Sequence, residues 1–338
     1  QGKHIVTANK ALIAEHGNEL ILLAEQAGVQ LRFEAAVAGG IPVIKTLREA
    51  LAANAVSEVA GIINGTGNFI LTEMSTKGRS YEDVLAEAQA LGYAEADPTF
   101  DVDGTDAAHK LVILASLAFG LPLDVAAPVK QGIQAITPED LKFAASMGYR
   151  VKHLGIARRQ GDRVEMRVHP TLIPEQKQLA NVDGVLNAIM IKGDAVGELV
   201  LVGPGAGGAA TASAVCADLA DIARTAAGSG PALGVPMGQL KSQTMVPADD
   251  IESEWYVRLA ASDCAGVMSD ITQVLANHDV SIESLLQNPP QEDQATVSIV
   301  LLTHVASASV MTAVMQEITA LTEVETDFTL LRVEAFDQ

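Results

Sequence analysis

Acidic and basic side chains are concentrated between residues 92 and 110, in a pattern that could carry proton chemistry. Asp106 and Lys110 are four residues apart, a spacing that places both side chains on one face of a helix. An apolar run, residues 111–114, follows Lys110. A lysine at the edge of such a run is partly removed from water and becomes a usable proton donor or acceptor. The alternative is an ordinary surface ion pair, which contributes about 0.3–0.5 kcal/mol.

Four further acids precede this pair and open a second interpretation, a metal site. They are Glu95, Asp97, Asp101 and Asp103. All four lie near the start of the expected helix, where the helix dipole favours negative charge. Asp101 and Asp103 followed by Gly104 do not match the EF-hand loop, which needs glycine at its sixth position and glutamate at its twelfth. A dedicated divalent site is therefore the weaker alternative.

Two other candidate positions lie where an expected strand turns into a helix. Asn9 and Lys10 follow a short β-branched run, and Gly65 and Thr66 follow a buried strand. Ligand sites of α/β proteins form at this carboxyl edge of the sheet. The N–H groups of Gly65 and Thr66 could bind a carboxylate, as helix starts do. The simpler alternatives are a solvated lysine at a helix start and an ordinary capped turn.

Glycines and other small residues mark two more candidate sites. Residues 203–208 match the pattern GxGxxG between a strand and a helix, but no second strand with a ribose-binding acid follows. The loop is therefore not a complete dinucleotide fingerprint, although it could let a cofactor approach the backbone. Glu34 is followed by small residues, 35–41, and one carboxylate with several carbonyls suits a weakly held cation. Periodicity alone does not decide this point.

The hydrophobic periodicity places these residues on strands and helices. Strands are predicted at 4–7, 31–37, 56–63 and 199–202, with helices at 8–27, 43–53, 69–76, 80–91, 105–118 and 211–227. Residues 129–201 are predicted to be mainly strands around one helix at 138–147. The C-terminal part predicts strands at 255–261, 280–287, 295–303 and 324–333 and helices at 266–277 and 307–321. That order is β-α-β-β-α-β, a ferredoxin-like unit.

The composition excludes several classes of protein. Of 338 residues, 49% are hydrophobic and only 4% aromatic, which is typical of an α/β protein with an aliphatic core. The net charge of −20 repels nucleic acid and anionic membranes, so neither is an expected partner. No run of about 18 apolar residues predicts a membrane span. The two cysteines, Cys216 and Cys264, form no metal or disulfide pattern, and free thiols suit a reducing cytoplasm.

Four motifs, taken in this order, resemble homoserine dehydrogenase. They are residues 6–12 (VTANKAL), 34–42 (EAAVAGGIP), 92–110 (from GYAEADP to DAAHK), and 203–207 together with 211–215. The resemblance runs through essentially the whole chain, and residues 92–110 are its most specific part. It implies NAD(P)-dependent interconversion of L-homoserine and L-aspartate 4-semialdehyde, a step in threonine, methionine and isoleucine biosynthesis.

The resemblance also implies roles for individual residues. Lys110 and Lys10 match the proposed catalytic lysines. The substrate-binding residues that it implies are Glu95, Asp106, Asp101, Tyr93, Gly65 and Thr66. The cofactor-binding residues that it implies are Lys10, Gly92, Gly205 and Gly207, for NADP or NAD. A monovalent cation, Na⁺ or K⁺, is expected at Glu34 and the carbonyl groups of Val37, Gly39 and Ile41.

These implied roles agree with the chemistry of the reaction. The substrate carries an ammonium group, which needs carboxylates such as Glu95. Hydride arrival at the aldehyde carbon builds an alkoxide, which a positioned ammonium can stabilise and protonate. The hydride itself belongs to the nicotinamide cofactor. The whole hypothesis depends on Lys10 and Lys110 meeting around one small amino acid.

The resemblance implies an α/β and α+β architecture in three parts. Residues 1–30 and 199–230 are expected to belong to a Rossmann nucleotide-binding domain, and residues 31–198 to a mixed-sheet catalytic and dimerisation domain. Residues 231–253 are expected to be a linker, and residues 254–338 a ferredoxin-like ACT domain. The ACT domain predicts amino-acid binding, with L-threonine as the expected regulator, and the family suggests a homodimer or homotetramer.

The chain begins without methionine, on residues 4–7 that already form a predicted strand. We therefore expect it to start inside the nucleotide-binding domain, after the first Rossmann half and the acid that selects NAD or NADP. On this expectation the chain alone binds cofactor poorly and shows little turnover.

Two other functions compete with this interpretation. One is a non-catalytic regulator that binds amino acids through its ACT domain. The combination of Lys10, Glu95, Asp106 and Lys110 favours the enzyme instead. The other is a semialdehyde dehydrogenase with a cysteine nucleophile, which ranks low because neither cysteine lies in a plausible nucleophile setting.

Overall fold

A computed structural model describes residues 2–225, 230–287 and 296–336. The chain divides into two compact units. The first unit contains residues 1–134, 153–169 and 181–246, and the second contains residues 135–152, 170–180 and 247–338. Every candidate site residue named above therefore belongs to the first unit, and the expected ACT domain belongs to the second.

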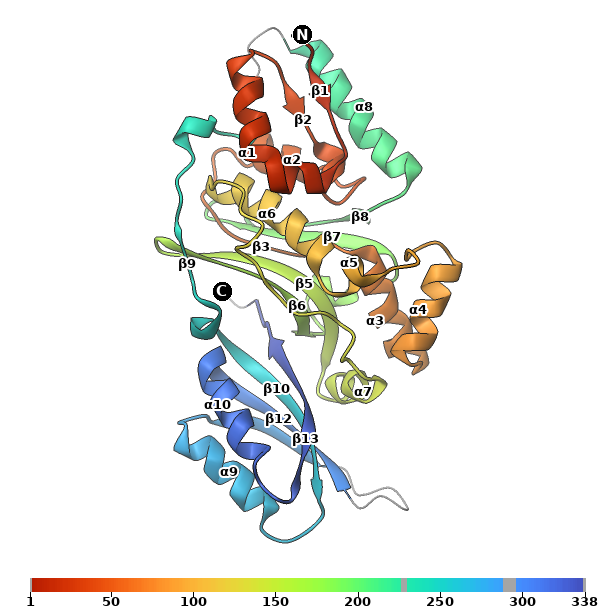
Figure 1. Cartoon of the computed structure of the whole chain (residues 1–338), viewed down its shortest axis with the longest axis vertical. Helices are drawn as coiled ribbons and strands as arrows, with labels where there is room; N and C mark the ends of the chain where they lie inside the picture. Colours follow the sequence, from red (N-terminus) through yellow and green to blue (C-terminus); the bar gives the residue numbers. More distant parts are fainter. Residues whose placement is uncertain (1, 226–229, 288–295, 337–338) are drawn as a thin grey trace. The chain divides into compact units, whose positions relative to one another are not determined.

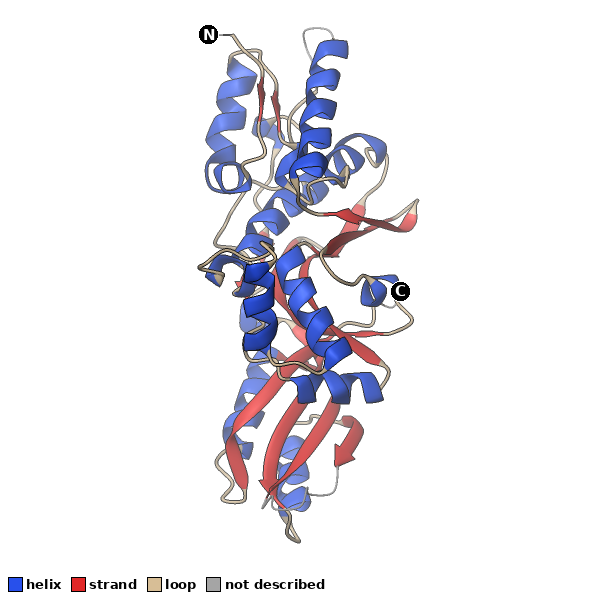
Figure 2. Ribbon diagram, turned by 90° about the vertical axis from the view of Figure 1, so that its right-hand side faces the viewer, coloured by secondary structure: helices blue, strands red, loops and turns tan. Residues whose placement is uncertain are grey.

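The N-terminal part of the first unit is a small parallel sheet between two helices. Strand β1 (Ile5–Val6) pairs in parallel with β2 (Leu31–Arg32). Helices α1 (Lys10–Gln26) and α8 (Gly208–Arg224) lie on either side of this pair (Figures 1 and 2). Helix α8, which follows the predicted strand and glycine loop near residue 205, thus packs against the N-terminal strand β1.

The predicted strand at 31–37 is only partly correct. It ends at Arg32, and residues Glu34–Ala36 form a 3₁₀ turn, η1. The N–H of Glu34 donates to Asp218 Oδ2 at 2.9 Å instead of to a neighbouring strand. Because this partner comes from a helix remote in sequence, local periodicity could not reveal the interruption.

Helix α1 buries one stripe of its surface. Its buried residues are Ile13, Ala14, Gly17, Ile21 and Ala24. Leu12, Leu22 and Leu23 are instead 38%, 44% and 52% exposed. Two isoleucines and three small residues therefore form the contact surface of this helix, and three of its leucines face outward.

The centre of the first unit is a mixed sheet. Its strand order is β6-β5-β3-β7-β8. The bounds are β3 (Val56–Ile62), β5 (Tyr149–Gln160), β6 (Arg163–Pro174), β7 (Leu186–Gly193) and β8 (Gly197–Pro204). Strand β3 is antiparallel to both its neighbours, whereas the short strands β4 (Val129–Lys130) and β9 (Thr244–Met245) run parallel to β6. The boundary between the two units falls within β5 and β6.

Helices of the first unit pack on this sheet and carry the candidate residues. They are α2 (Val43–Lys45), which continues as a π turn, η2 (Thr46–Ala50), and α3 (Gly65–Lys77), α4 (Tyr81–Ala90), α5 (Thr99–Val102) and α6 (Thr105–Phe119). Helix α6 packs on β3 and is buried along most of its length. Helix α3 begins at Gly65 rather than at residue 69, because Asn64 caps it and brings the Gly-Thr-Gly segment into its first turn.

The second unit contains the predicted ferredoxin-like fold. Its bounds are α7 (Pro138–Ser146), β10 (Glu252–Ser262), α9 (Val267–Asn277), β11 (Ile282–Gln287), β12 (Thr296–Ser307), α10 (Ala308–Ile318) and β13 (Val324–Val333). The strand order β11-β12-β10-β13 is antiparallel throughout. Helices α9 and α10 cover one face of these strands (Figure 1), and the core between them includes Leu259, Ile271 and Val314. The β-α-β-β-α-β order is therefore confirmed.

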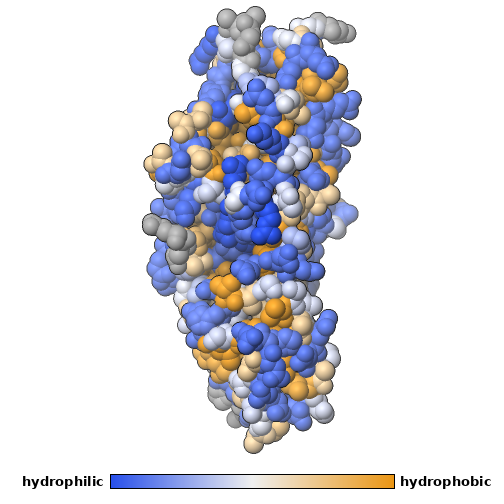
Figure 3. Space-filling view, turned by 90° about the vertical axis from the view of Figure 1, so that its left-hand side faces the viewer, coloured by the Kyte–Doolittle hydropathy of each residue, from blue (hydrophilic) through white to orange (hydrophobic). Residues whose placement is uncertain are grey.

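The expected linker has more structure than its composition suggested. Thr244 and Met245 form β9, and β10 begins at Glu252, inside the predicted linker. Residues 226–229, at the junction of the predicted helix and the linker, lie outside the described residues. None of the helices in the described ranges is long and apolar enough to cross a membrane. Hydrophilic side chains predominate on the face in Figure 3, in keeping with the net charge of −20.

Candidate active site

Three charged side chains from two helices meet in the first unit. Lys110 Nζ donates to Asp106 Oδ2 at 2.6 Å, and Lys10 Nζ lies 3.1 Å from Asp106 Oδ1. Asp106 is only 3% exposed. The lysine side chains are more open, at 13% for Lys110 and 34% for Lys10. The structure therefore brings the two lysines together on one buried carboxylate, although they are far apart in the sequence.

Helix α6 positions one side of this cluster. It begins after Gly104, whose φ of 89° is a backbone conformation that glycine adopts without strain. Asp106 is in the first turn, and Lys110 follows one turn later on the same face. Lys110 Nζ also donates to the Ile63 carbonyl at 2.7 Å, at the end of β3. Two of the three ammonium hydrogens of Lys110 are thus engaged, and one is left for a ligand.

Helix α1 positions the other lysine at its first residue. The helix start is fixed by Asn9, whose Oδ1 accepts the N–H of Leu12 at 3.0 Å. The centroid of the Phe100 ring lies 5.6 Å from Lys10 Nζ, within the range of a cation–π contact. The Phe100 and His109 rings pack in a T-shaped arrangement with 5.4 Å between their centroids. Burial lowers the pKa of His109, so its imidazole is neutral at pH 7 and adds no third cation beside the lysines.

Asn64 is a site residue that the sequence analysis did not identify. Its Nδ2 donates to Asp106 Oδ2 at 2.8 Å and to Asp101 Oδ1 at 2.9 Å. Its Oδ1 accepts the N–H of Gly67 at 2.7 Å and so caps α3. In the sequence, Asn64 stands between a buried strand and the Gly-Thr-Gly segment. This position indicates a helix cap, but it does not indicate the hydrogen bonds to Asp101 and Asp106.

The two acids joined by Asn64 differ electrostatically. Burial alone would raise the pKa of Asp106, but the charges of Lys110 and Lys10, with hydrogen bonds from Lys110 and Asn64, outweigh it and leave the pKa below its usual range. Burial raises the pKa of Asp101, and the nearby Asp106 charge adds to the effect. Asp106 is therefore firmly ionised, whereas Asp101 holds its charge less firmly.

Thr66 and Tyr93, both expected to bind substrate, are in contact with each other. The Thr66 hydroxyl donates to the Tyr93 carbonyl at 2.6 Å and so anchors the loop between α4 and α5. The Tyr93 ring packs edge-on against Phe69 with 5.1 Å between centroids, and it is 44% exposed. Gly65 and Thr66 are the first two residues of α3, where N–H groups have no carbonyl one turn earlier to bond.

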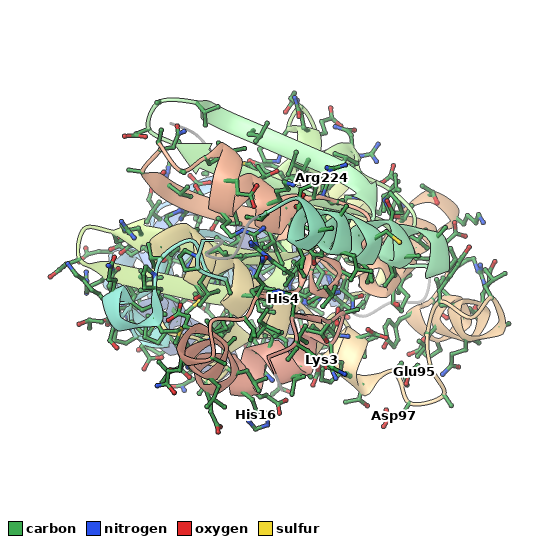
Figure 4. The ribbon with its side chains drawn as sticks, turned by 90° about the horizontal axis from the view of Figure 1, so that it is seen from above. Lys3, His4, His16, Glu95, Asp97 and Arg224 are labelled. Atoms are coloured by element: carbon green, nitrogen blue, oxygen red, sulfur yellow. The ribbon has the colours of Figure 1, made fainter. Side chains whose placement is uncertain are left out.

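Glu95 is not part of the observed cluster. It is exposed in the loop that precedes α5, and Figure 4 shows this loop, with Glu95 and Asp97, at the periphery of the ribbon. Within the described parts of the chain its carboxylate makes no hydrogen bond or ion pair, and only its backbone carbonyl is bonded, by Gln89. The acid that lies beside Asp106 is Asp101, through Asn64.

The glycines expected to contact the cofactor have different surroundings. A Cβ at Gly205 would lie 1.2 Å from Asn187 Oδ1, and a Cβ at Gly39 would lie 2.6 Å from the Gly205 carbonyl, so both are required by internal packing. Gly207, with φ of 111°, precedes α8, and nothing lies within 4 Å of its would-be Cβ. Gly92, with φ of 75°, is equally open. The backbone at Gly207 and the start of α8 is thus accessible enough to receive a nucleotide.

The expected cation site centres on a carboxylate that already has protein partners. Glu34 accepts the N–H groups of Ile44 and Lys45, both at 2.9 Å, at the start of α2. Burial raises the pKa of Glu34 to about 7, and these two hydrogen bonds only partly oppose it. The Ile41 carbonyl accepts the N–H of Val43 at 2.8 Å. Each of these oxygens has a further lone pair, so a cation would be an additional partner.

Among residues 2–225, 230–287 and 296–336, no group of three or more His, Cys, Asp or Glu side chains could hold a metal ion.

Comparisons with known proteins agree with this geometry. Residues 42–220 match the family model described as homoserine dehydrogenase, and residues 256–323 match the ACT domain. A homoserine dehydrogenase from Neisseria gonorrhoeae is 52% identical over 338 residues, which cover 99% of this chain and 78% of the relative.

Solved structures give the same result. A homoserine dehydrogenase from Thiobacillus denitrificans superimposes with a TM-score of 0.93 at 48% identity, over 99% of this chain and 77% of that one. A hyperthermophilic archaeal homoserine dehydrogenase, in complex with NADPH, superimposes with a TM-score of 0.58 at 32% identity. That match covers 66% of this chain and 64% of the archaeal chain.

Proposed function

Because the chain belongs to the homoserine dehydrogenase family, we propose that Lys110 is the proton donor and acceptor at the reacting oxygen of its substrate. The family interconverts L-homoserine and L-aspartate 4-semialdehyde with NAD(P). The observation that carries the assignment is the meeting of Lys110 and Lys10 on the buried Asp106. Such a cluster holds two ammonium groups beside one small substrate.

The bound nicotinamide supplies or accepts the hydride. Lys110 directs one N–H to the Ile63 carbonyl and one to Asp106, which leaves its third N–H for the substrate oxygen. When the aldehyde is reduced, this ammonium gives its proton to the alkoxide, and in the reverse direction the amine takes the proton back. Lys10 adds a second positive charge that stabilises negative charge on the same oxygen.

The substrate ammonium is expected to bind at Asp101. Its Oδ1 is bonded to Asn64, and no described residue uses its Oδ2. The N–H groups of Gly65 and Thr66 suit the substrate carboxylate, because they open α3. Glu95 can join as a second acid if the loop before α5 turns its carboxylate inward.

The test of this proposal is a kinetic comparison of two lysine variants. Lys110→Ala removes the proton donor and should lower kcat for homoserine oxidation by about 10²–10⁴-fold. Lys142→Ala, on an exposed turn of α7, is the matched control and should leave kcat unchanged. A Lys110→Ala enzyme that keeps kcat within about threefold would overturn the assignment.

For the cofactor, the open backbone at Gly92 and Gly207 and the side chain of Lys10 are the expected contacts. The complex of the archaeal relative with NADPH supports NADP as the cofactor. The packing of α8 on β1 supports the joint assignment of residues 1–30 and 199–230 to the nucleotide-binding domain. Because β2, at residues 31–32, pairs with β1, the proposed catalytic domain, residues 31–198, begins after this strand.

A monovalent cation at Glu34 is a separate part of the proposal, with the carbonyls of Val37, Gly39 and Ile41 as further ligands. The buried carboxylate supports it, since an adjacent cation would offset the cost of burying its charge. Sodium or potassium chloride should raise the melting temperature more than choline chloride at equal ionic strength. This difference should disappear in Glu34→Gln, and its persistence there would exclude the site.

The ACT domain of the second unit supports amino-acid binding, and we assign L-threonine as its ligand in a homodimer or homotetramer. The melting temperature should rise with increasing L-threonine concentration, whereas L-alanine at the same concentrations should not raise it. Equal responses to the two amino acids would contradict this assignment.

A further inference from the structure

The turn between β3 and α3 contacts both members of the Asp106–Lys110 pair. The first residue of this turn, Ile63, accepts a hydrogen bond from Lys110 Nζ at 2.7 Å. The next residue, Asn64, donates to Asp106 at 2.8 Å. The Ile63 carbonyl thus accepts from the ammonium group of Lys110, and the Asn64 amide donates to the carboxylate of Asp106. The pair is held from outside its own helix as well as by its four-residue spacing.

The amide group of Asn64 is suited to this place in a way that a carboxylate is not. Its oxygen is identified by the cap of α3, where it accepts the N–H of Gly67 at 2.7 Å. The NH₂ group must therefore face the two acids, and its two hydrogens match two acceptors, Asp106 and Asp101. Asn64 is 4% exposed, so water cannot easily replace these donors.

We propose that Asn64 is a positioning residue for the reaction, which sets the direction of the Asp106 carboxylate toward the two lysines and keeps Asp101 beside it. The proposal rests on the assigned roles of Asp106 and Lys110. Without the amide, two carboxylates would face each other across the turn, and Asp106 could rotate away from Lys10. The free N–H of Lys110 would then lose its fixed direction toward the reacting oxygen.

A purely structural role as a helix cap predicts a different outcome from a positioning role. Aspartate caps helices as well as asparagine does, so Asn64→Asp preserves α3. The same change replaces the two donors by a third carboxylate. The charged groups around it would be Asp101 from α5, Asp106 and Lys110 from α6 and Lys10 from α1. His153 from β5 also approaches, since its Nδ1 would lie 3.6 Å from a Cβ at Gly67.

The experiment is a pH profile of kcat/KM for homoserine in the wild type and Asn64→Asp. At low pH the new carboxyl group is protonated and can still donate one hydrogen bond to Asp106. As the pH rises it ionises and repels both acids, because carboxylates that share a site cannot all be charged easily. We expect kcat/KM to fall by about 10- to 100-fold at alkaline pH, with a smaller loss at acid pH, where the melting temperature should also change least.

Two controls make the result decisive. Ser80→Ala removes the cap of α4, where Ser80 accepts the N–H of Asp83, and should lower the melting temperature without changing the pH profile. Asn64→Ser keeps a capping oxygen but cannot reach both acids, so it should lose about tenfold in kcat/KM even if Asn64→Asp does not fold.

A wild-type pH profile for Asn64→Asp, or an unchanged kcat/KM for Asn64→Ser, overturns the positioning role. If Lys110→Ala remains inactive in that case, the proposed function still stands and only this inference fails.

Discussion

Each unit buries a carboxylate among cationic and neutral hydrogen-bond donors, but the two clusters differ in whether a ligand can reach those donors. Asp106 is 3% exposed and Asp140 is 0% exposed. Each has cationic and neutral donors around it. Around Asp106 the cations are Lys110 and Lys10, whose side chains are 13% and 34% exposed. Water or a ligand can therefore reach the ammonium groups, although the acid between them is buried.

Around Asp140 the donors are more numerous and more rigid. Arg258 Nε donates to Oδ1 at 2.6 Å and Tyr256 donates to the same oxygen at 3.1 Å. Thr137 donates to Oδ2 through both its N–H and its hydroxyl, and Thr329 adds a further bond to that oxygen. The planar guanidinium fixes its direction of bonding, and the capping box of α7 fixes the acid.

This difference indicates what distinguishes a reactive site from a structural one. Both regions bury a carboxylate with enough partners to keep it charged. The Asp140 cluster uses its donors within the protein, and the arginine has no proton that it can readily give up. The Asp106 cluster uses lysines, which can transfer protons, and among the described residues it leaves one N–H of Lys110 without a partner. A site for chemistry therefore needs unused donors as well as buried charge.

The largest effect is expected on the stability of the second unit. Asp140→Ala leaves the Arg258 guanidinium, only 15% exposed, with Glu139 at 3.5 Å as its one remaining carboxylate among the described residues. Breaking a buried ion pair in this way costs about 3–5 kcal/mol. The free energy of unfolding, measured by urea denaturation, should fall by that amount, while kcat below the unfolding transition is retained.

Asp327→Ala is the matched control for this prediction, because Asp327 is exposed on β13 of the same unit. Its effect should stay within about 0.5 kcal/mol. A loss of activity without a loss of stability in Asp140→Ala would mean that the Asp140 cluster is more than structural.

The next largest effect is expected on catalysis. Asp106→Asn keeps the size of the side chain but removes the charge that holds Lys110 and Lys10 together. Misplacement of reacting groups by about 1 Å costs on the order of 100-fold. We expect kcat/KM for homoserine to fall by about that factor. A fall of less than tenfold would show that the lysines keep their places without Asp106.

The two clusters also differ in how far the sequence could predict them. Asp106 and Lys110 are one helical turn apart, so their contact follows from local geometry alone. Lys10 could be added because the residues around it belong to a motif that resembles the family. Asp140 and Arg258 are remote from each other in the sequence, and no local pattern joins them. Their pairing depends on the packing of α7 against β10.

The same reasoning explains which contacts at the candidate site the sequence did not reveal. The order of strands and helices follows from periodicity and was largely correct. Asn64 was overlooked because the two bonds of its amide go to α5 and α6, which only the tertiary fold brings near. The hydrogen bond from the Thr66 hydroxyl to the Tyr93 carbonyl was also not predicted, because Tyr93 belongs to a loop whose path no periodicity describes.

A smaller effect is expected from the pH dependence of stability. The neighbouring lysines hold the pKa of Asp106 below its ordinary value in the folded chain, despite burial. A lowered folded pKa contributes stability that is complete above the unfolded value of about 4 and is lost as the pH falls through the folded pKa. The excess unfolding free energy of the wild type over Asp106→Asn should therefore shrink below about pH 4. Urea denaturation of both proteins between acid and neutral pH measures this difference in unfolding free energy. A difference that does not change with pH would contradict the assigned ionisation of Asp106.

The smallest effect concerns Phe100, which lies under Lys10 and has no counterpart in the Asp140 cluster. Lys10 is the more exposed lysine, so its direction depends on weak contacts, and a cation–π contact at such a site contributes about 0.5–1 kcal/mol. Phe100→Ala should lower kcat/KM by about two- to fivefold through the loss of this contact. Phe100→Leu keeps apolar bulk against His109 but has no ring face, so it should lose about as much as the alanine variant. Wild-type kinetics for Phe100→Leu would mean that the residue acts only by packing, and that Asp106 alone directs Lys10.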